Sequence, residues 1–266
     1  MGELQNPRAV AWATKLEKAC YRRARQIVVA TDGIRRRLLE RGLPANKVTF
    51  IPNGANIQIF QPQPEAGKQR RAELGLNGKF VVLYTGILGV AQGMETLAEA
   101  AHLLMGHSDI HFLIIGEGPK KNELVTLKEK LQLRNFTLLG EKRQKEMASY
   151  FSAGDAALVP LRKLDLFNGA LPSKMFEAWA CTCPVILSVN GEARTVLENA
   201  QAGLHAEPED AAAIAAAILK LKNEPAARRQ MGENGRRFVE ENYSRERAAQ
   251  KLEQLLEQII ASGRNP

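Results

Sequence analysis

A lysine and a glutamate three residues apart are the side chains of this sequence best placed to do chemistry. Lys174 and Glu177 open a stretch in which five of the seven residues from 174 to 180 are apolar. The pattern predicts a helix buried on most sides, with both charges on one face near its first turn. A buried helix seldom carries two ionisable groups unless each has a partner. Either the two pair with each other, or the lysine binds a phosphate while the carboxylate accepts hydrogen bonds from sugar hydroxyls. The surrounding sequence favours the second interpretation.

Glycine-bearing loops are the next candidates. The apolar run 80–84 is followed by a loop that carries Gly86 and Gly89, and a helical pattern begins at residue 95. Glycines let a backbone approach a ligand, and a helix N-terminus offers free N–H groups to a phosphate. The loop is neither a P-loop nor a dinucleotide fingerprint, so alone it is a weak signal. After the third apolar run, Arg143 is either a contact for a phosphate or base, or simply solvated.

An alternation of strands and helices must position these residues. Short apolar runs recur every 20 to 30 residues with amphipathic stretches between them, which predicts a parallel, doubly wound sheet of about six strands. Ligands bind beyond the carboxyl ends of such strands, where the candidate residues fall. The predicted strands are 80–84, 111–115, 136–139, 156–159, 185–188 and, as a sixth candidate, 203–206. The predicted helices are 95–105, 121–130, 145–151, 174–181, 193–199, 211–222, 226–240 and 244–261.

The first 58 residues form a separate part. They are predicted as a helix (7–24), a strand (27–30), a helix (33–41) and a strand (48–51), and residues 60–65 resemble a linker. Residues 1–50 hold eleven Lys and Arg against four acids, so most of the net charge of +8 lies here. Such a face is either merely solvated or attracts an anionic membrane surface, nucleic acid or an acidic partner. Nucleic acid is disfavoured because no aromatic-rich binding motif accompanies the charge.

Composition excludes several classes of protein. The chain has 266 residues and 45% hydrophobic content, which suits a globular protein. No apolar run approaches the length of a membrane span, and no signal peptide is expected. The three cysteines, Cys20, Cys181 and Cys183, form neither a disulfide framework nor a metal site. A cytoplasmic protein with buried, reduced thiols is expected.

Seven motifs in register resemble a known family. Together they look like the donor-binding half of a family 4 retaining glycosyltransferase of the GT-B fold, from about Ala19 to the C-terminus. Two of the variants look most like bacterial transferases of O-antigen, capsule and exopolysaccharide assembly, which often use nucleotide-linked amino sugars. The motifs are Pro52-Asn53-Gly54, the Gly86 loop, Gly116-Glu117-Gly118-Pro119, Leu139-Gly140, Pro172-Ser173-Lys174 with Glu177, Ala180-Cys181 before Pro184-Val185-Ile186, and Met231-Gly232-Glu233-Asn234-Gly235-Arg236.

The resemblance implies a role for each candidate residue. Lys174 would neutralise the donor diphosphate and act in catalysis, and Glu177 would bind the ribose hydroxyls. No metal or other cofactor is implied, because Lys174 and the helix dipole supply the counter-charge. Uridine diphosphate is the expected nucleotide, and a glycan or lipid-linked molecule at the inner membrane face is the expected acceptor. The other residues expected at the donor are Gly86, Gly89 and Gln92 for the diphosphate, Arg143, and Gly169, Ala170 and Leu171 for the sugar.

Several positions depart from the family pattern. Gly169 stands where a glutamate is common, and Ile87 and Gln92 replace basic or amide residues, which leaves the contacts to the donor sugar open. Cys181-Thr182 replaces Cys-Gly, and threonine is costly at a left-handed helix cap, so strain is expected there.

The length departs from the pattern too. Residues 1–58 resemble only the end of an acceptor domain, 59–243 the donor domain, and 244–266 a crossover helix. A truncated frame or one half of a split enzyme is therefore hypothesised, with a partner chain supplying the acceptor domain and with slow or no transfer by this chain alone. The alternatives are a non-catalytic nucleotide-sugar-binding module and a GT-B sugar-nucleotide epimerase. The second is disfavoured because none of the four histidines is expected to be catalytic.

Overall fold

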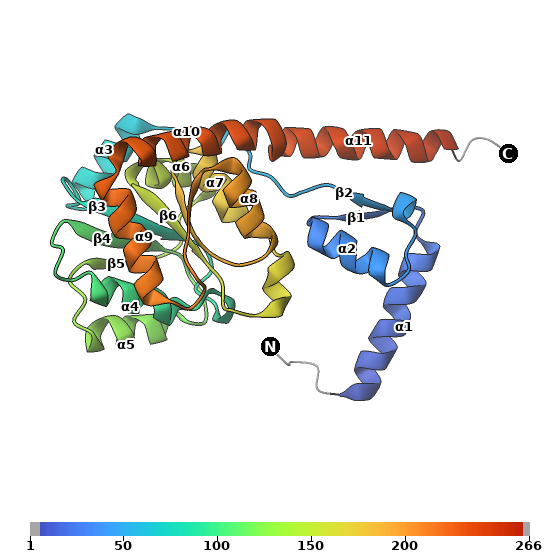
Figure 1. Ribbon diagram of the computed structural model, residues 1–266, viewed down its shortest axis with the longest axis horizontal. Helices are drawn as coiled ribbons and strands as arrows, with labels where there is room; N and C mark the ends of the chain where they lie inside the picture. Colours follow the sequence, from blue (N-terminus) through green and yellow to red (C-terminus); the bar gives the residue numbers. More distant parts are fainter. Residues whose placement is uncertain (1–5, 263–266) are drawn as a thin grey trace. The chain divides into compact units, whose positions relative to one another are not determined.

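The computed structural model describes residues 6–262, which form two compact units. The first holds the chain up to Pro52 and again from Gln250 onward, and the second holds Asn53–Ala249. Within the described residues, none of the helices is both long and apolar enough to cross a membrane. Figure 1 shows the helices and strands of each unit.

The second unit is built on a parallel sheet of six strands in the order β5-β4-β3-β6-β7-β8, as the sequence predicts. The strand order places β3 and β6 at the centre, where the chain reverses its direction of winding. The strands are β3 (Phe80–Thr85), β4 (Ile110–Ile115), β5 (Phe136–Leu139), β6 (Ala156–Pro160), β7 (Val185–Ser188) and β8 (Gly203–His205). Its helices are α3 (Pro64–Glu73), α4 (Met94–Leu103), α5 (Lys121–Lys130), α6 (Gln144–Ala153), α7 (Ser173–Ala180), α8 (Glu192–Ala200), α9 (Ala211–Asn223) and α10 (Pro225–Asn242). Helix α11 (Arg245–Ser262) begins in this unit and continues into the first. Short 3-10 turns lie at η2 (Val90–Gln92) and η3 (Asp165–Gly169).

Both faces of this sheet are buried, which explains why its strands read as continuous apolar runs. Along β3, Val81 and Leu83 belong to one hydrophobic cluster, while Val82 and Tyr84 belong to another. Residues of α6, α7 and α8 pack in the first cluster, and residues of α4, α5 and α9 pack in the second (Figure 1). The alternation follows from the two-residue period of a strand.

One helix was not expected. The segment 60–65, predicted as a linker, ends early because α3 begins at Pro64. Its sequence, PEAGKQRRAE, lacks an apolar stripe, so periodicity could not reveal it. The helix is recognisable only from the proline in its first turn, a position that suits proline because its missing N–H has no helical partner there.

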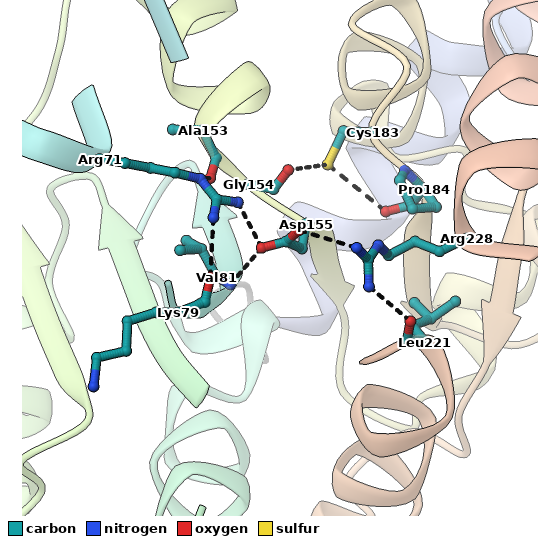
Figure 2. Close-up of polar contacts among 10 residues, drawn as sticks. All are labelled: Arg71, Lys79, Val81, Ala153, Gly154, Asp155, Cys183, Pro184, Leu221 and Arg228. Carbon is teal, nitrogen blue, oxygen red and sulfur yellow. Dashed lines mark hydrogen bonds and ion pairs between the residues drawn. The ribbon is translucent and has the colours of Figure 1, made fainter. Parts of the chain in front are cut away.

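A polar cluster ties the amino end of this sheet together. Asp155, just before β6, accepts hydrogen bonds through Oδ2 from Arg71 of α3 at 2.5 Å and from the backbone N–H of Val81 at 2.9 Å. Its Oδ1 lies 3.5 Å from the guanidinium of Arg228 on α10 (Figure 2). One carboxylate therefore links two strands and two helices far apart in sequence.

The first unit contains α1 (Pro7–Arg23), β1 (Ile27–Val29), α2 (Asp32–Glu40), η1 (Ala45–Lys47) and β2 (Val48–Phe50). The two strands pair in parallel, with Ile27 opposite Val48. The Oγ1 of Thr31 accepts the N–H of Ile34 and so caps α2. Most of α11, from Gln250 onward, also belongs here, and Arg25 donates a 3.3 Å hydrogen bond to Ser262 near the end of that helix.

The strained turn predicted after α7 is confirmed. Thr182 has a φ of +58°, in the left-handed region that is costly for a β-branched residue. Its hydroxyl donates to the Cys181 carbonyl at 2.7 Å.

We expect Thr182→Gly to raise the free energy of unfolding by about 1 kcal/mol, because the relief of roughly 1–2 kcal/mol of backbone strain exceeds the value of one partly exposed hydrogen bond. Urea denaturation of the two proteins measures the difference. Thr182→Ala, which keeps a Cβ in the same conformation, is the control and should gain less. A less stable glycine variant would show that the hydroxyl contributes more than the strain costs.

Candidate functional site

The carboxyl ends of β3 and β4 hold two glycine loops in close contact. The strands run level, with Thr85 opposite Ile115, so the loops that follow emerge side by side. The N–H of Gly86 donates to the Ile115 carbonyl at 3.0 Å. A Cβ added at Gly116 would overlap the Gly86 carbonyl, so only glycine allows this approach.

Further hydrogen bonds fix the first loop. The N–H of Leu88 donates to the Glu117 carbonyl, and the Leu88 carbonyl accepts from Lys120 N–H, both at 2.8 Å. The Tyr84 hydroxyl donates to the Ile87 carbonyl at 2.6 Å. Burial raises the pKa of Tyr84 well above its usual range, so it remains a donor. The loop is therefore held in one shape before any ligand arrives.

The turn that follows is braced from β6. The guanidinium Nε of Arg162 donates to the Val90 carbonyl at 2.7 Å, and the Arg162 N–H donates to the Ala91 carbonyl at 2.8 Å. The same guanidinium pairs with Glu95 and, at 3.0 Å, with Glu209. Arg162 thus links η2, the start of α4 and the segment that carries Glu209.

The predicted pair stands at the opening of α7. Lys174 Nζ lies 2.9 Å from Glu177 Oε2, so the two side chains do pair with each other. Glu177 is 5% exposed, whereas the side chain of Lys174 is 41% exposed. A Cβ placed on Gly86 would stand 3.7 Å from Lys174 Cε, so the lysine lies against the glycine loop. The ammonium has three donors, and the pair leaves two of them for a ligand.

A pocket of about 500 Å³ joins these features. Gly86 and Gly116 form one wall, and Lys174 and Glu177 another, so the structure brings together the residues that the sequence singled out. Two cations and three carboxylates lie in its lining, together with apolar side chains. The lining residues are Phe60, Thr85, Gly86, Ile87, Ile115, Gly116, Glu117, Glu141, Lys142, Gln144, Met147, Lys174 and Glu177.

Other predicted residues do not line this pocket. Gly89 and Gln92 lie next to each other in the braced turn, and Arg143 is exposed at the start of α6, where its N–H donates to Glu146. Gly169 ends η3, and Ala170 and Leu171 connect it to α7. Their contacts with a donor therefore stay predictions.

The sequence analysis did not single out the residues of a third wall of the pocket, called the far wall, which is formed by Glu117, Glu141 and Lys142. Glu117 lies inside the Gly116–Pro119 turn, and Glu141 and Lys142 follow the last residues of β5. A Cβ on Gly140 would lie 3.1 Å from Glu117 Oε1, so the two loops adjoin. Each loop follows a strand at the ligand-binding edge, and two of the family motifs, Gly116–Pro119 and Leu139-Gly140, contain or adjoin these residues. Neither signal singles out their side chains.

Among residues 6–262, the structure holds no group of three or more His, Cys, Asp or Glu side chains that could ligate a metal ion. The pocket instead offers two lysine ammonium groups, three carboxylates and the backbone of its loops. This set of groups suits a ligand with both an anionic group and hydroxyls.

These features define a class of protein. A doubly wound parallel sheet, with glycine loops and a charge pair at the carboxyl ends of its strands, is the architecture that nucleotide-binding α/β domains use. The family described as "Glycosyl transferases group 1" matches residues 67–238, and the chain belongs to it. A second family, "Glycosyltransferase Family 4", matches residues 3–59.

Individual relatives agree with this assignment. The chain is 28% identical to the alpha-D-kanosaminyltransferase of Streptomyces kanamyceticus over 93% of its length, covering 63% of that protein. It is 25% identical to the capsular polysaccharide biosynthesis glycosyltransferase CapM of Staphylococcus aureus over 90% of its length, again covering 63% of the relative. The chain therefore spans less than two thirds of the relatives it matches.

Solved structures agree on the fold. Anabaena HepE in complex with UDP-glucose superposes with a TM-score of 0.80 at 18% identity, covering 90% of this chain and 65% of HepE. The predicted GT-B fold class is confirmed.

Proposed function

We propose that this protein transfers a sugar, with retention, from a nucleotide diphosphate sugar to a hydroxyl of a glycan or lipid-linked acceptor in cell-surface polysaccharide synthesis. The observation that carries the proposal is the Lys174–Glu177 pair, which lines one pocket with the Gly86 loop. In this assignment Lys174 contacts the diphosphate and is the catalytic residue, and Glu177 accepts hydrogen bonds from the ribose hydroxyls.

The energetics of the pocket are adequate for a donor. A charge-assisted hydrogen bond contributes about 1.5–3 kcal/mol, and micromolar affinity corresponds to about 8 kcal/mol. Hydrogen bonds from Lys174 to the diphosphate and from the ribose to Glu177 would supply most of that. Because the Gly86 loop is already ordered by hydrogen bonds, little of the binding energy is spent on fixing it.

The donor nucleotide and sugar are assigned by likeness. HepE holds UDP-glucose, and the kanosaminyltransferase by its name transfers an amino sugar. We therefore assign a UDP-linked sugar, with an amino sugar as the first candidate. The capsular transferase supports a polysaccharide acceptor. An anionic membrane surface near such an acceptor is the proposed location.

In the transfer step, negative charge develops on the leaving diphosphate as the bond to the sugar breaks. In this assignment Lys174 stabilises that charge electrostatically, so the proposal requires no cofactor. None of the four histidines, all in the described part of the chain, lines the pocket. This disfavours the sugar-nucleotide epimerase, which relies on side-chain acid–base chemistry.

A calorimetric panel of UDP, GDP, ADP and inorganic pyrophosphate tests the proposal. Lys174→Ala should weaken every diphosphate by about 10- to 100-fold, the value of one charge-assisted hydrogen bond. Lys220→Ala, an exposed lysine on α9 far along the sequence, removes the same charge and should change nothing. Because the substitution leaves Glu177 buried without its cation, thermal unfolding is measured alongside. Unchanged diphosphate affinity in a folded Lys174→Ala protein would refute the assignment.

A further inference from the structure

A second pocket, of about 680 Å³, lies in the first unit and is strongly basic. It forms between α1 and the turn after α2. Five of its nine lining residues are cations and none is a carboxylate. The lining residues are Lys15, Lys18, Tyr21, Arg22, Arg41, Gly42, Leu43, Pro44 and Lys47.

Little of this charge is neutralised within the protein. Arg41 pairs with Glu17 at 2.7 Å, and Lys47 donates to the Arg22 carbonyl at 2.9 Å. Within the described residues, the charged groups of Lys15 and Arg22 form no ion pair or hydrogen bond, and Lys18 has only a longer-range electrostatic interaction with Glu17, which already pairs with Arg41. These three cations lie three and four residues apart on α1 and so share one face. An unpaired cluster of this kind attracts a multivalent anion.

The same helix carries large exposed apolar side chains. No residue of α1 is buried. Trp12 is 67% exposed and Leu16 50% exposed, one turn apart. Trp12 also lies one turn before Lys15, so the apolar pair borders the cations. Tryptophan beside lysine and arginine is typical of helices that lie in the headgroup region of a membrane.

We propose that this pocket binds the phosphate of an anionic membrane lipid, with Trp12 and Leu16 entering the interface beside it. A soluble phosphate ester offers the pocket the same chemistry but gives Trp12 and Leu16 nothing to contact, so the exposed pair favours the lipid. This lipid site rests on the membrane location given in the proposed function. Binding of the protein to vesicles, however, does not require sugar transfer. The two can therefore fail separately.

Tryptophan fluorescence gives a direct test, because the chain has two tryptophans and the other, Trp179, is fully buried. Vesicles of phosphatidylcholine with phosphatidylglycerol should shift the Trp12 emission to the blue and saturate. Vesicles of phosphatidylcholine alone, or millimolar inorganic phosphate, should not shift it. Raising the salt to 0.5 M should weaken the effect, since it screens exposed charges. A shift that persists in Trp12→Phe would mean that the signal does not come from α1 and would overturn the proposal.

A second experiment removes the cations that line the basic pocket on α1. The triple variant Lys15→Ala, Lys18→Ala, Arg22→Ala should lose roughly fivefold in vesicle affinity for each cation, on the order of 100-fold in all. The matched control Lys220→Ala, Arg229→Ala, Lys251→Ala removes three exposed cations from other helices and should lose far less. Both variants should keep the circular dichroism spectrum and the thermal unfolding of the wild type, which shows that they are folded. Equal losses in the two triples, or binding of inorganic phosphate with no affinity for anionic vesicles, would overturn the lipid site.

Discussion

Replacing Asp155 by alanine should lower the free energy of unfolding by about 3 kcal/mol or more, the cost of removing one partner from a buried ion pair. The side chain of Asp155 is only 17% exposed and meets two arginines (Figure 2). Its removal leaves the guanidinium groups of Arg71 and Arg228 without their shared carboxylate, so their two positive charges are no longer compensated. It also leaves the N–H of Val81 without its acceptor. Urea denaturation followed by circular dichroism measures the change.

Two further variants separate the causes. Asp155→Asn keeps an acceptor for the Val81 N–H but removes the charge, so it should fall between alanine and wild type. Glu198→Ala breaks the exposed bridge to Arg194 on α8 and should cost less than about 1 kcal/mol. If Asp155→Ala proves as mild as Glu198→Ala, the cluster at the amino end of the sheet does not hold its strands and helices together.

The sheet could be predicted from the sequence because each strand is buried on both faces. Val81, Val82 and Leu83 are all apolar although they point alternately into different clusters, so the run is visible without periodicity. Helix α3 could not be predicted in the same way. It packs through Gly67, whose Cα faces the Ser152 carbonyl closely, and through Arg71, not through an apolar stripe. Contacts of that kind leave no pattern in a sequence.

The part of the site that could be predicted is the part where an ionisable side chain stands in an otherwise buried, apolar helix. Glu177 stood out because a carboxylate in an apolar helix needs a partner, and it is indeed buried beside Lys174. The far wall was not predictable, because loops carry charges for many reasons. On the loop after β5, the sequence predicts Arg143 as a donor contact, whereas its neighbour Lys142 lines the pocket. The direction of a side chain that follows a strand depends on the path of the loop, which propensity does not define.

Replacing Glu177 tests most sharply which part of the donor each residue binds. The replacement should lower the affinity for UDP, while the affinity for pyrophosphate stays level or rises. If the carboxylate accepts two hydroxyl groups of a ribose, Glu177→Ala should weaken UDP by roughly 100-fold or more, the value of two charge-assisted hydrogen bonds. Glu177→Gln keeps one neutral acceptor and should lose about tenfold, since neutral hydrogen bonds are about half as strong. Calorimetry on folded proteins measures both losses.

Pyrophosphate has no ribose and should behave differently. In the free protein, Glu177 holds Lys174 at 2.9 Å, so an incoming phosphate shares the ammonium with a carboxylate whose negative charge repels it. Glu177→Gln removes that repulsion and leaves Lys174 to the phosphate alone. Pyrophosphate affinity should therefore stay level or rise a few-fold while UDP affinity falls. Equal losses for both ligands would mean that Glu177 acts only by orienting Lys174, and the ribose would then have to be bound elsewhere in the pocket, where Glu117 and Glu141 are the remaining carboxylates.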